Sequence, residues 1–197
     1  MPSLVVPFRG AEGKSRLELS TTAARAVLVR AMLADVVAAC LAVGPTFVVT
    51  PDDTLVEGAT LVLDPRRGQG EAVRAGLNAA FAAGGTEPVL VVNADLPCAT
   101  ARDLFALAGA LPTRGLALAP AADGTTNALA LASIDLFVPV YGPGSAARFA
   151  ALAPSRAVDS PNLRDDVDTV ADLERLGPRL GAHTRAALLA LREAAAA

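Results

Sequence analysis

The sequence has very few of the side chains that bind transition metals or form disulfides. His183 is the only histidine, and Cys40 and Cys98 are the only cysteines, far apart and without metal-ligand spacing. Zinc binding and Cys/His catalysis are therefore not expected. Two cysteines are too few for a disulfide scaffold, so both are predicted to be reduced thiols in or near the core of a cytoplasmic protein.

The chain also lacks a strong net charge and a long apolar run. Its formal net charge is −3, so no basic surface for nucleic acid is expected, and an anionic substrate would need a local basic site or a metal ion. No apolar run is long enough to span a membrane, and no basic segment precedes residues 3–7, so no signal peptide is predicted. The length of 197 residues predicts a single domain, 1–197. The sequence does not decide between a monomer and a homo-oligomer.

Short apolar runs alternate with longer amphipathic segments along the chain. The short runs predict strands over 4–6, 46–50, 60–63, 88–92, 116–119 and 127–131. The segments with helical spacing predict helices over 23–42, 70–83, 100–111, 145–152, 168–176 and 183–196, the last with a frayed Ala-rich end. This alternation predicts an α/β fold, a three-layer sandwich around a mostly parallel sheet.

Asp95 follows a strand of four apolar residues, 89–92, and precedes Pro97. A continuous apolar run is typical of a strand buried on both faces, so Asp95 is predicted at the carboxyl end of a central strand. Ligands of open α/β sheets bind at that edge, where a carboxylate can hold a metal ion. The alternative is a loop aspartate that caps the helix beginning near Thr100.

A second acidic cluster comes late in the chain, at Asp165-Asp166-Val167-Asp168. In extended chain, Asp166 and Asp168 point to the same side, where two like charges favour a divalent cation between them. Asp168 could equally cap the helix that follows. Together with Asp95, the two would form one site of three carboxylates.

The loop from Gly10 to Leu17 follows the first strand and contains Gly13, Lys14, Ser15 and Arg16, with Lys14 the only lysine of the chain. Backbone N–H groups and two cations at a strand end suit phosphates. A P-loop would need glycine at the position of Phe8, which argues against it. The loop is otherwise a looser Gly-rich loop of the nucleotidyltransferase kind, or a plain surface loop.

Three other loops carry small or basic residues. Residues 64–70 contain two arginines and two glycines before a helix, with Gly76-Leu77-Asn78 further on; residues 123–127 end in Thr126-Asn127; and residues 141–145 read Tyr-Gly-Pro-Gly-Ser. Each could bind an anion or a substrate oxygen through helix-terminal or loop N–H groups. Each could also be an ordinary turn or helix cap.

Taken in order, these pieces resemble the guanylyltransferases of deazaflavin (F-420-type) coenzyme biosynthesis. The resemblance covers nearly the whole chain and rests on these segments: Val6-Pro7 with 13–17, 76–78, 94–97, 126–129, 141–145 and 166–169. Two positions differ from the family pattern as we know it. Arg9 stands where we expect lysine in a loop about one residue short, and Thr125 stands where we expect glycine.

The resemblance implies a GT-A-like nucleotidyltransferase fold, GTP as donor, Mg²⁺, and phosphoenolpyruvate or 2-phospho-L-lactate as acceptor. It implies that GMP is transferred to the acceptor phosphate and pyrophosphate is released. The implied catalytic residues are Lys14, Arg16 and Asp95; the metal ligands are Asp95, Asp166 and Asp168. The implied nucleotide-binding residues are Pro7, Gly13, Lys14, Arg16 and Asn78; the implied acceptor-binding residues are Thr126, Asn127, Gly142, Gly144 and Ser145.

The choice between the two acceptors rests on amino-acid composition and not on any residue of the acceptor site. The Ala- and Arg-rich composition is typical of bacteria with GC-rich genomes, where members of this family typically use phosphoenolpyruvate. Three alternatives stay open: another nucleotidyltransferase, making a molybdenum-cofactor dinucleotide or a sugar nucleotide; a P-loop NTPase; and a non-catalytic nucleotide-binding module. The last requires that Asp95 lie far from Asp166 and Asp168.

Overall fold

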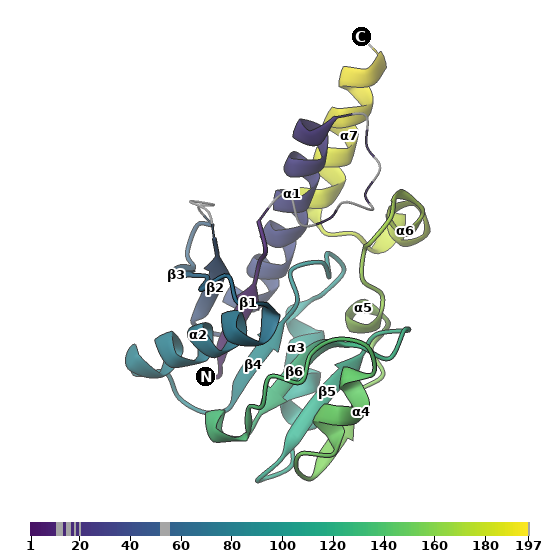
Figure 1. Cartoon of the computed structure of the whole chain (residues 1–197). Helices are drawn as coiled ribbons and strands as arrows, with labels where there is room; N and C mark the ends of the chain where they lie inside the picture. The colour runs from purple at the N-terminus through teal and green to yellow at the C-terminus, as the bar shows by residue number, and fades with distance from the viewer. Residues whose placement is uncertain (11–13, 15–16, 18, 20, 52–55, 197) are drawn as a thin grey trace.

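The computed structural model describes residues 1–10, 14, 17, 19, 21–51 and 56–196. Within them, one sheet has the strand order β3-β2-β1-β4-β6-β5-β7 (Figure 1). The strands are β1 Ser3–Pro7, β2 Thr46–Thr50, β3 Thr60–Leu63, β4 Val89–Val92, β5 Leu116–Pro120, β6 Thr126–Leu131 and β7 Ser155–Ala157. The helices are α1 Thr22–Leu41, α2 Gln69–Ala82, α3 Ala101–Gly109, α4 Ser145–Ala150, α5 Pro161–Arg164, α6 Val170–Leu176 and α7 Ala182–Ala196, with single 3₁₀ turns η1 Ile134–Leu136 and η2 Gly177–Arg179.

The sheet separates two apolar cores, which confirms the predicted three-layer sandwich. Successive side chains of a strand point to opposite faces, so Leu4 and Val6 of β1 pack in one core and Val5 packs in the other. The first core also contains α1, α3 and α6, and the second contains α2 and α4. Because β1, β2 and β4 are covered on both faces, their residues are buried and apolar almost throughout.

The strand directions bring the carboxyl ends of the parallel strands and the amino end of β6 to one edge of the sheet. Strands β1, β2, β3 and β4 run parallel, and β6 runs antiparallel to β4, with Val92 opposite Ala128. The start of β6 therefore lies beside the end of β4. Thr126 and Asn127 meet the segment that leads to Asp95, although the two segments are about 30 residues apart in the chain.

The predicted elements are all present with ends shifted by a few residues, and the sequence analysis missed β7, α5 and the two 3₁₀ turns. β7 is an edge strand of three partly or fully exposed residues, Ser-Arg-Ala, and α5 is a single turn, so both are too short to show a hydrophobic pattern. α7 continues through Ala196, consistent with the high helix propensity of alanine.

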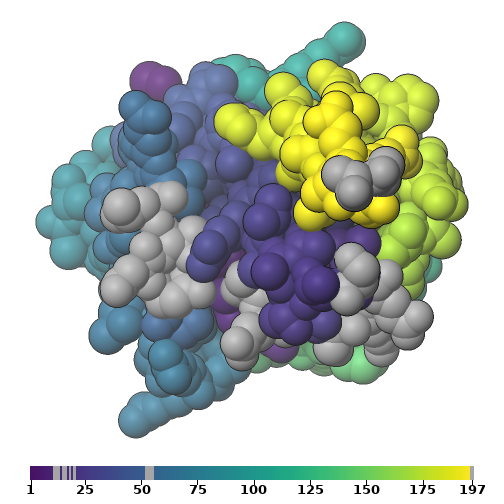
Figure 2. All heavy atoms as spheres, turned by 90° about the horizontal axis from the view of Figure 1, so that it is seen from above, coloured from purple at the N-terminus to yellow at the C-terminus, as the bar shows by residue number. Residues whose placement is uncertain are grey.

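Helices α1 and α7 pack side by side, as Figures 1 and 2 both show. Asp35 of α1 is buried, and its two carboxylate oxygens accept hydrogen bonds from the backbone N–H groups of His183 and Thr184, each at 2.9 Å. A side chain of one helix therefore caps the start of the other. His183 contributes its backbone N–H here, and the residue is exposed.

Cys40 and Cys98 are buried and unbridged, as expected of core thiols. Among the residues that the structure describes, no helix is both long and apolar enough to cross a membrane.

Candidate functional site

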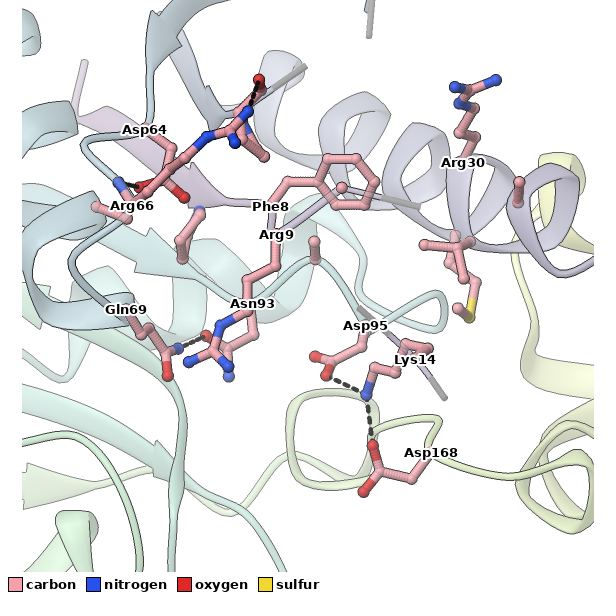
Figure 3. A pocket seen from close by; sticks show the side chains of 18 of the residues that line it. Phe8, Arg9, Lys14, Arg30, Asp64, Arg66, Gln69, Asn93, Asp95 and Asp168 are labelled. Atoms are coloured by element: carbon pink, nitrogen blue, oxygen red, sulfur yellow. Dashed lines mark hydrogen bonds and ion pairs between the residues drawn. The ribbon is translucent and has the colours of Figure 1, made fainter. Parts of the chain in front are cut away.

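A cleft of about 1100 Å³ lies at the carboxyl ends of β1 and β4 (Figure 3). Its lining includes Pro7 at the end of β1, the three residues 8–10 that follow, residues 93–95 after β4, Asp168, and the first turns of α1 and α2. The start of α1 contributes Thr22 and Ala23, and the start of α2 contributes Gly68 and Gln69. Helix N-termini present backbone N–H groups with a partial positive charge, so two such ends in one cleft suit an anionic ligand.

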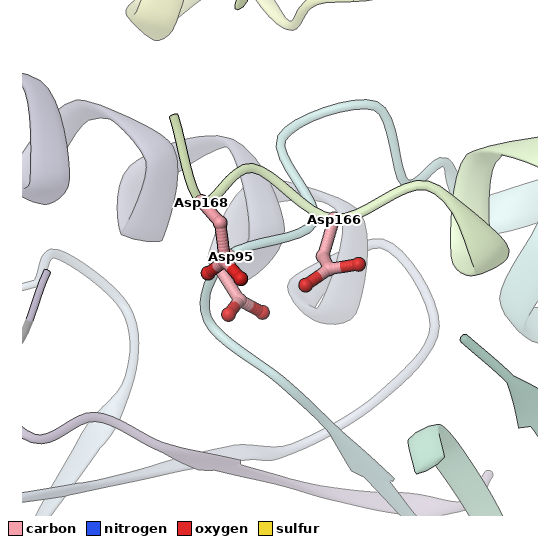
Figure 4. A group of neighbouring side chains, drawn as sticks. All are labelled: Asp95, Asp166 and Asp168. Atoms are coloured by element: carbon pink, nitrogen blue, oxygen red, sulfur yellow. The ribbon is translucent and has the colours of Figure 1, made fainter. Parts of the chain in front are cut away.

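Three carboxylates converge beside this cleft (Figure 4). Asp95 follows β4, and Asp166 and Asp168 lie in the segment between α5 and α6. One carboxylate oxygen from each lies within 4.8 Å of the others. The alternatives to a metal site, in which Asp95 or Asp168 caps the helix that follows it, are both wrong. Thr100 caps α3 in a capping box with Asp103, and Thr169 caps α6 in a capping box with Asp172.

The environment of these acids fits a hard divalent cation. Asp95 Oδ1 is buried and has no hydrogen-bond partner among the described residues. Burial raises the pKa of Asp166 above its usual value, and the charge of Asp95 adds to this effect. Carboxylate oxygens are the ligands that Mg²⁺ prefers, and a cation here would satisfy the unpartnered oxygen and offset the like-charge repulsion.

Lys14 places its ammonium group among the same acids. Its Nζ donates to Asp95 Oδ2 at 2.6 Å and to Asp168 Oδ1 at 2.5 Å (Figure 3). Burial alone would lower the pKa of Lys14, but the charge of Asp95 and the hydrogen bonds to both carboxylates outweigh burial and raise it. The lysine therefore stays charged at neutral pH, at the point where the cleft meets the acid cluster.

The segment that carries Asp166 and Asp168 is held by its neighbours. Asp165, 12% exposed, accepts hydrogen bonds from Arg179 at 2.5 Å and from Arg164 at 3.3 Å. On the other side, Asp172 Oδ2 accepts hydrogen bonds from the backbone N–H groups of Asp168 and Thr169. Asp165, the first aspartate of the run, therefore fixes the backbone, while Asp166 and Asp168 belong to the group of three converging carboxylates.

Three of the predicted acceptor-binding residues form a buried cluster next to the acids. Thr126 and Asn127 begin β6, and Ser145 begins α4 and donates its Oγ hydrogen to Thr126 Oγ1 at 3.2 Å. All three side chains are at most 3% exposed. Asn127 Nδ2 donates to the carbonyl of Arg164 at 3.0 Å and lies 3.5 Å from Asp166 Oδ1, which joins this cluster to the acids.

Gly142 and Gly144 shape the loop that enters α4. Their φ angles of 104° and 71° lie in the left-handed region, which glycine adopts without strain. Arg148 donates hydrogen bonds to the carbonyl groups of Val140, Tyr141 and Pro143. Gly144 is the N-cap residue of α4, so Ser145 does not cap this helix, and Arg148 holds the loop backbone in place.

The predicted nucleotide-binding residues are only partly brought together. Pro7 and Lys14 line the cleft, and Gly13 and Arg16 lie outside the described residues. Asn78 is exposed on α2 and is not among the cleft residues, because it follows Gln69 by two and a half turns and faces the other way. In the segment Gly76-Leu77-Asn78 it is Gly76 that meets the sheet: a Cβ there would lie 2.4 Å from Val5 Cγ1.

Sequence reasoning missed a pair of amides at the junction of the cleft and the acceptor cluster. Gln69 donates to Asn93 Oδ1 at 2.9 Å, and Asn93 Nδ2 donates to the Thr126 carbonyl at 3.2 Å. Gln69 begins α2 and Asn93 stands two residues before Asp95. The one available signal was a polar residue at the end of an apolar strand.

Comparisons with known proteins agree with this arrangement. A family model described as "Guanylyl transferase CofC like" matches residues 3–176. A phosphoenolpyruvate guanylyltransferase of Sphaerobacter thermophilus is 40% identical over 188 residues, covering 87% of this chain and 90% of that protein. A 2-phospho-L-lactate guanylyltransferase of Natrialba magadii is 36% identical over 197 residues, covering 86% and 80%.

Among solved structures, one from Desulfovibrio desulfuricans G20, provisionally assigned as a nucleotide-diphospho-sugar transferase, shares the fold. It superposes with a TM-score of 0.75 at 21% identity and covers 98% of both chains. At this identity the likeness concerns the fold alone. The family match spans both clusters of side chains described above, including all three converging acids. The chain therefore belongs to the CofC-like guanylyl transferase family.

Proposed function

We propose that this chain transfers GMP from GTP to the phosphate of phosphoenolpyruvate, in the pathway to the deazaflavin coenzyme F-420. The products are enolpyruvoyl-diphospho-guanosine and pyrophosphate. The observation that carries the proposal is the convergence of Asp95, Asp166 and Asp168 between a cleft and a cluster of polar side chains. The name of the relative that is 40% identical supports the same reaction. We also propose that residues 1–197 work as one nucleotidyltransferase domain.

The positions of the site residues indicate which part of the substrates each would hold. Asp95, Asp166 and Asp168 would hold Mg²⁺, which would supply positive charge beside the phosphoryl group that is transferred. Lys14, which reaches two of these acids, would contact the α-phosphate side of the nucleotide, and Pro7, which lines the same cleft, would also contact the nucleotide. Gly13 and Arg16 of the same loop would bind the remaining phosphates. Residues 126–127 and 142–145 would hold the acceptor, largely through backbone groups, because Thr126 and Ser145 are buried and bonded to each other.

The reaction does not require a protein base. A phosphate monoester has its second pKa near about 6, so the acceptor is mostly a dianion at neutral pH. One of its oxygens attacks the α-phosphorus of GTP, and the bond from that phosphorus to the bridging oxygen of the β-phosphate breaks, releasing pyrophosphate. The protein positions the two phosphates in line and neutralises their charge. Accordingly, His183 is not part of the cleft lining.

2-Phospho-L-lactate is the second candidate acceptor, since a relative at 36% identity carries that name. The two acids differ at C2, which is planar in phosphoenolpyruvate and tetrahedral in phospholactate. Loop 142–144, with its two left-handed glycines, lies next to the cluster that would hold this part of the acceptor.

The test is pyrophosphate release from GTP and Mg²⁺ with the two acceptors in parallel. We expect turnover with phosphoenolpyruvate at the higher kcat/KM. Asp95→Asn should lower turnover by at least about a hundredfold, because it removes a metal-binding charge beside the reacting phosphate. Asp135→Asn, on an exposed residue of η1, removes the same charge and should leave turnover unchanged. Full activity of Asp95→Asn would contradict the role of the acids.

A further inference from the structure

Asp64 is a carboxylate of the cleft that the proposed reaction leaves without a task. It follows β3, lines the cleft together with Arg66 and Gly68, and is labelled in Figure 3 on the side of the cleft opposite Asp95 and Asp168. Phe8 and Arg9 lie between the two sides in that view. Asp64 is therefore not a member of the metal-binding cluster.

The backbone holds Asp64 in a defined position. Its N–H donates to the carbonyl of Thr50 at 3.0 Å, which ties it to the end of β2. Its Oδ1 accepts a hydrogen bond from the N–H of Arg66 at 2.7 Å, and Arg66 has a φ of 58°, a conformation that costs a non-glycine residue about 1 kcal/mol or more. Oδ2 has no hydrogen-bond partner among the residues that the structure describes. A strained turn thus presents one carboxylate edge at the cleft.

The charges of the cleft indicate which part of a nucleotide meets Asp64. The opposite side contains Lys14, the start of the 20-residue helix α1, and Arg30, all of which favour phosphates. Asp95 and Asp168 on that side would be neutralised by Lys14 and the proposed Mg²⁺, whereas Asp64 has no such cation among the described residues, and the guanidinium of Arg66 beside it donates to the carbonyl of Pro51. A carboxylate without a bound cation repels phosphate groups, so the triphosphate belongs on the side of Lys14 and the base on the side of Asp64. Ala72 and Pro51 also line the cleft and supply apolar surface for the flat faces of a base.

We propose that Asp64 selects guanine, accepting hydrogen bonds from its N1–H and its 2-amino group. This inference rests on the proposed use of GTP. Guanine presents two adjacent donors on this edge, and a carboxylate, which only accepts, matches them. Adenine presents an acceptor at N1 and would face the carboxylate unfavourably. Hypoxanthine, the base of ITP, keeps N1–H and lacks the 2-amino group, so it isolates one of the two hydrogen bonds.

The test compares the dissociation constants of GTP, ITP and ATP, measured by calorimetry with Mg²⁺, and the kcat/KM values of the three nucleotides. For the unaltered protein we expect GTP to bind about tenfold to a hundredfold more tightly than ITP, the usual effect of one hydrogen bond to a charged group. In Asp64→Asn the preference for GTP over ITP should fall to about threefold or less, and the KM for the acceptor should not change. Asparagine keeps an Oδ1 for the N–H of Arg66, so the turn is preserved.

Glu71→Gln is the matched control. It removes the same charge from the first turn of α2, where Glu71 lies 3.7 Å from Arg74 and outside the cleft lining, and it should keep the preference for GTP. If Asp64→Asn keeps the full preference for GTP over ITP, or if the unaltered protein does not distinguish them, the inference is wrong. Because binding is measured without turnover, a protein that prefers GTP but releases no pyrophosphate would contradict the proposed function and leave the role of Asp64 standing.

Discussion

Replacing Gly76 with alanine tests how closely helix α2 packs on the sheet and what this contact does for the cleft. Gly76 lies in the middle of α2, and a Cβ placed there would be 2.4 Å from Val5 Cγ1 and 2.8 Å from Val49 Cγ2. Carbon atoms in contact are normally about 3.5–4.0 Å apart. Val5 and Val49 are fully buried in central strands, so the helix must move by about 1 Å.

Two effects of opposite sign decide the stability of Gly76→Ala. Alanine improves helix propensity by about 1 kcal/mol, and overpacking a rigid core costs about 1–3 kcal/mol. With two clashes, we expect a net loss of about 1–2 kcal/mol in the free energy of unfolding, measured by urea denaturation, or roughly 2–8 °C in Tm. Because the start of α2 carries Gly68 and Gln69 into the cleft, the KM for GTP should also rise severalfold.

A variant as stable as the unaltered protein, or more stable, would refute this reasoning, because propensity alone would then decide. The double variant Val5→Ala/Gly76→Ala gives a second check. Val5→Ala removes one clashing methyl group, so Gly76→Ala should cost clearly less in that background than alone. Equal costs in both backgrounds would show that the contact with Val5 is not the cause.

Two predictions concern acidic residues near the cleft. Burial would raise the pKa of Asp172, but hydrogen bonds from Thr169 and Arg175 outweigh it and lower the pKa to about 2. The charged Asp172 therefore stabilises the protein by about 1–2 kcal/mol above the usual aspartate pKa of about 3.9, and this stabilisation is lost as the pH falls toward 2. In acid denaturation curves, the difference in stability between Asp172→Asn and the unaltered protein should disappear over the same pH range. Asp166 has a raised pKa because of burial and the charge of Asp95, so Asp166→Asn should raise the free energy of unfolding measured in the presence of a chelator. It should abolish Mn²⁺ binding measured by calorimetry, and a loss of stability in chelator would contradict the account.

The sequence allowed the fold class and most of the site to be predicted because the signals are local. Apolar runs such as 89–92 identify buried strands, and the acid that follows a central strand must lie at the ligand-binding edge. A different local signal indicated Asp166 and Asp168, since two acids that alternate in extended chain point to the same side. Their convergence with Asp95 could only be proposed, since some 70 residues separate the two segments and no local pattern reports that distance.

Other features of the structure depend on contacts between distant segments, which no local sequence pattern indicates. Asp35 looks like an ordinary polar residue of α1, yet it caps α7 from about 150 residues away. Asn78 directly follows Gly76-Leu77, yet its position on the helix turns it to solvent. Asp64 could only be described as part of a basic loop, because its place opposite Lys14 depends on how β2, β3 and α2 pack.

By itself, the sequence determined the alternation of strands and helices, the chemistry of the loops and the family to which they belong, since each depends on residue type and short-range order. The tertiary structure decided which of those loops meet. It brought three aspartates within 4.8 Å, placed Lys14 between two of them, and buried Thr126 against Ser145. Strand order and direction cause these contacts. Because β6 lies beside β4 and runs antiparallel to it, β6 begins at the edge of the sheet where the parallel strands end.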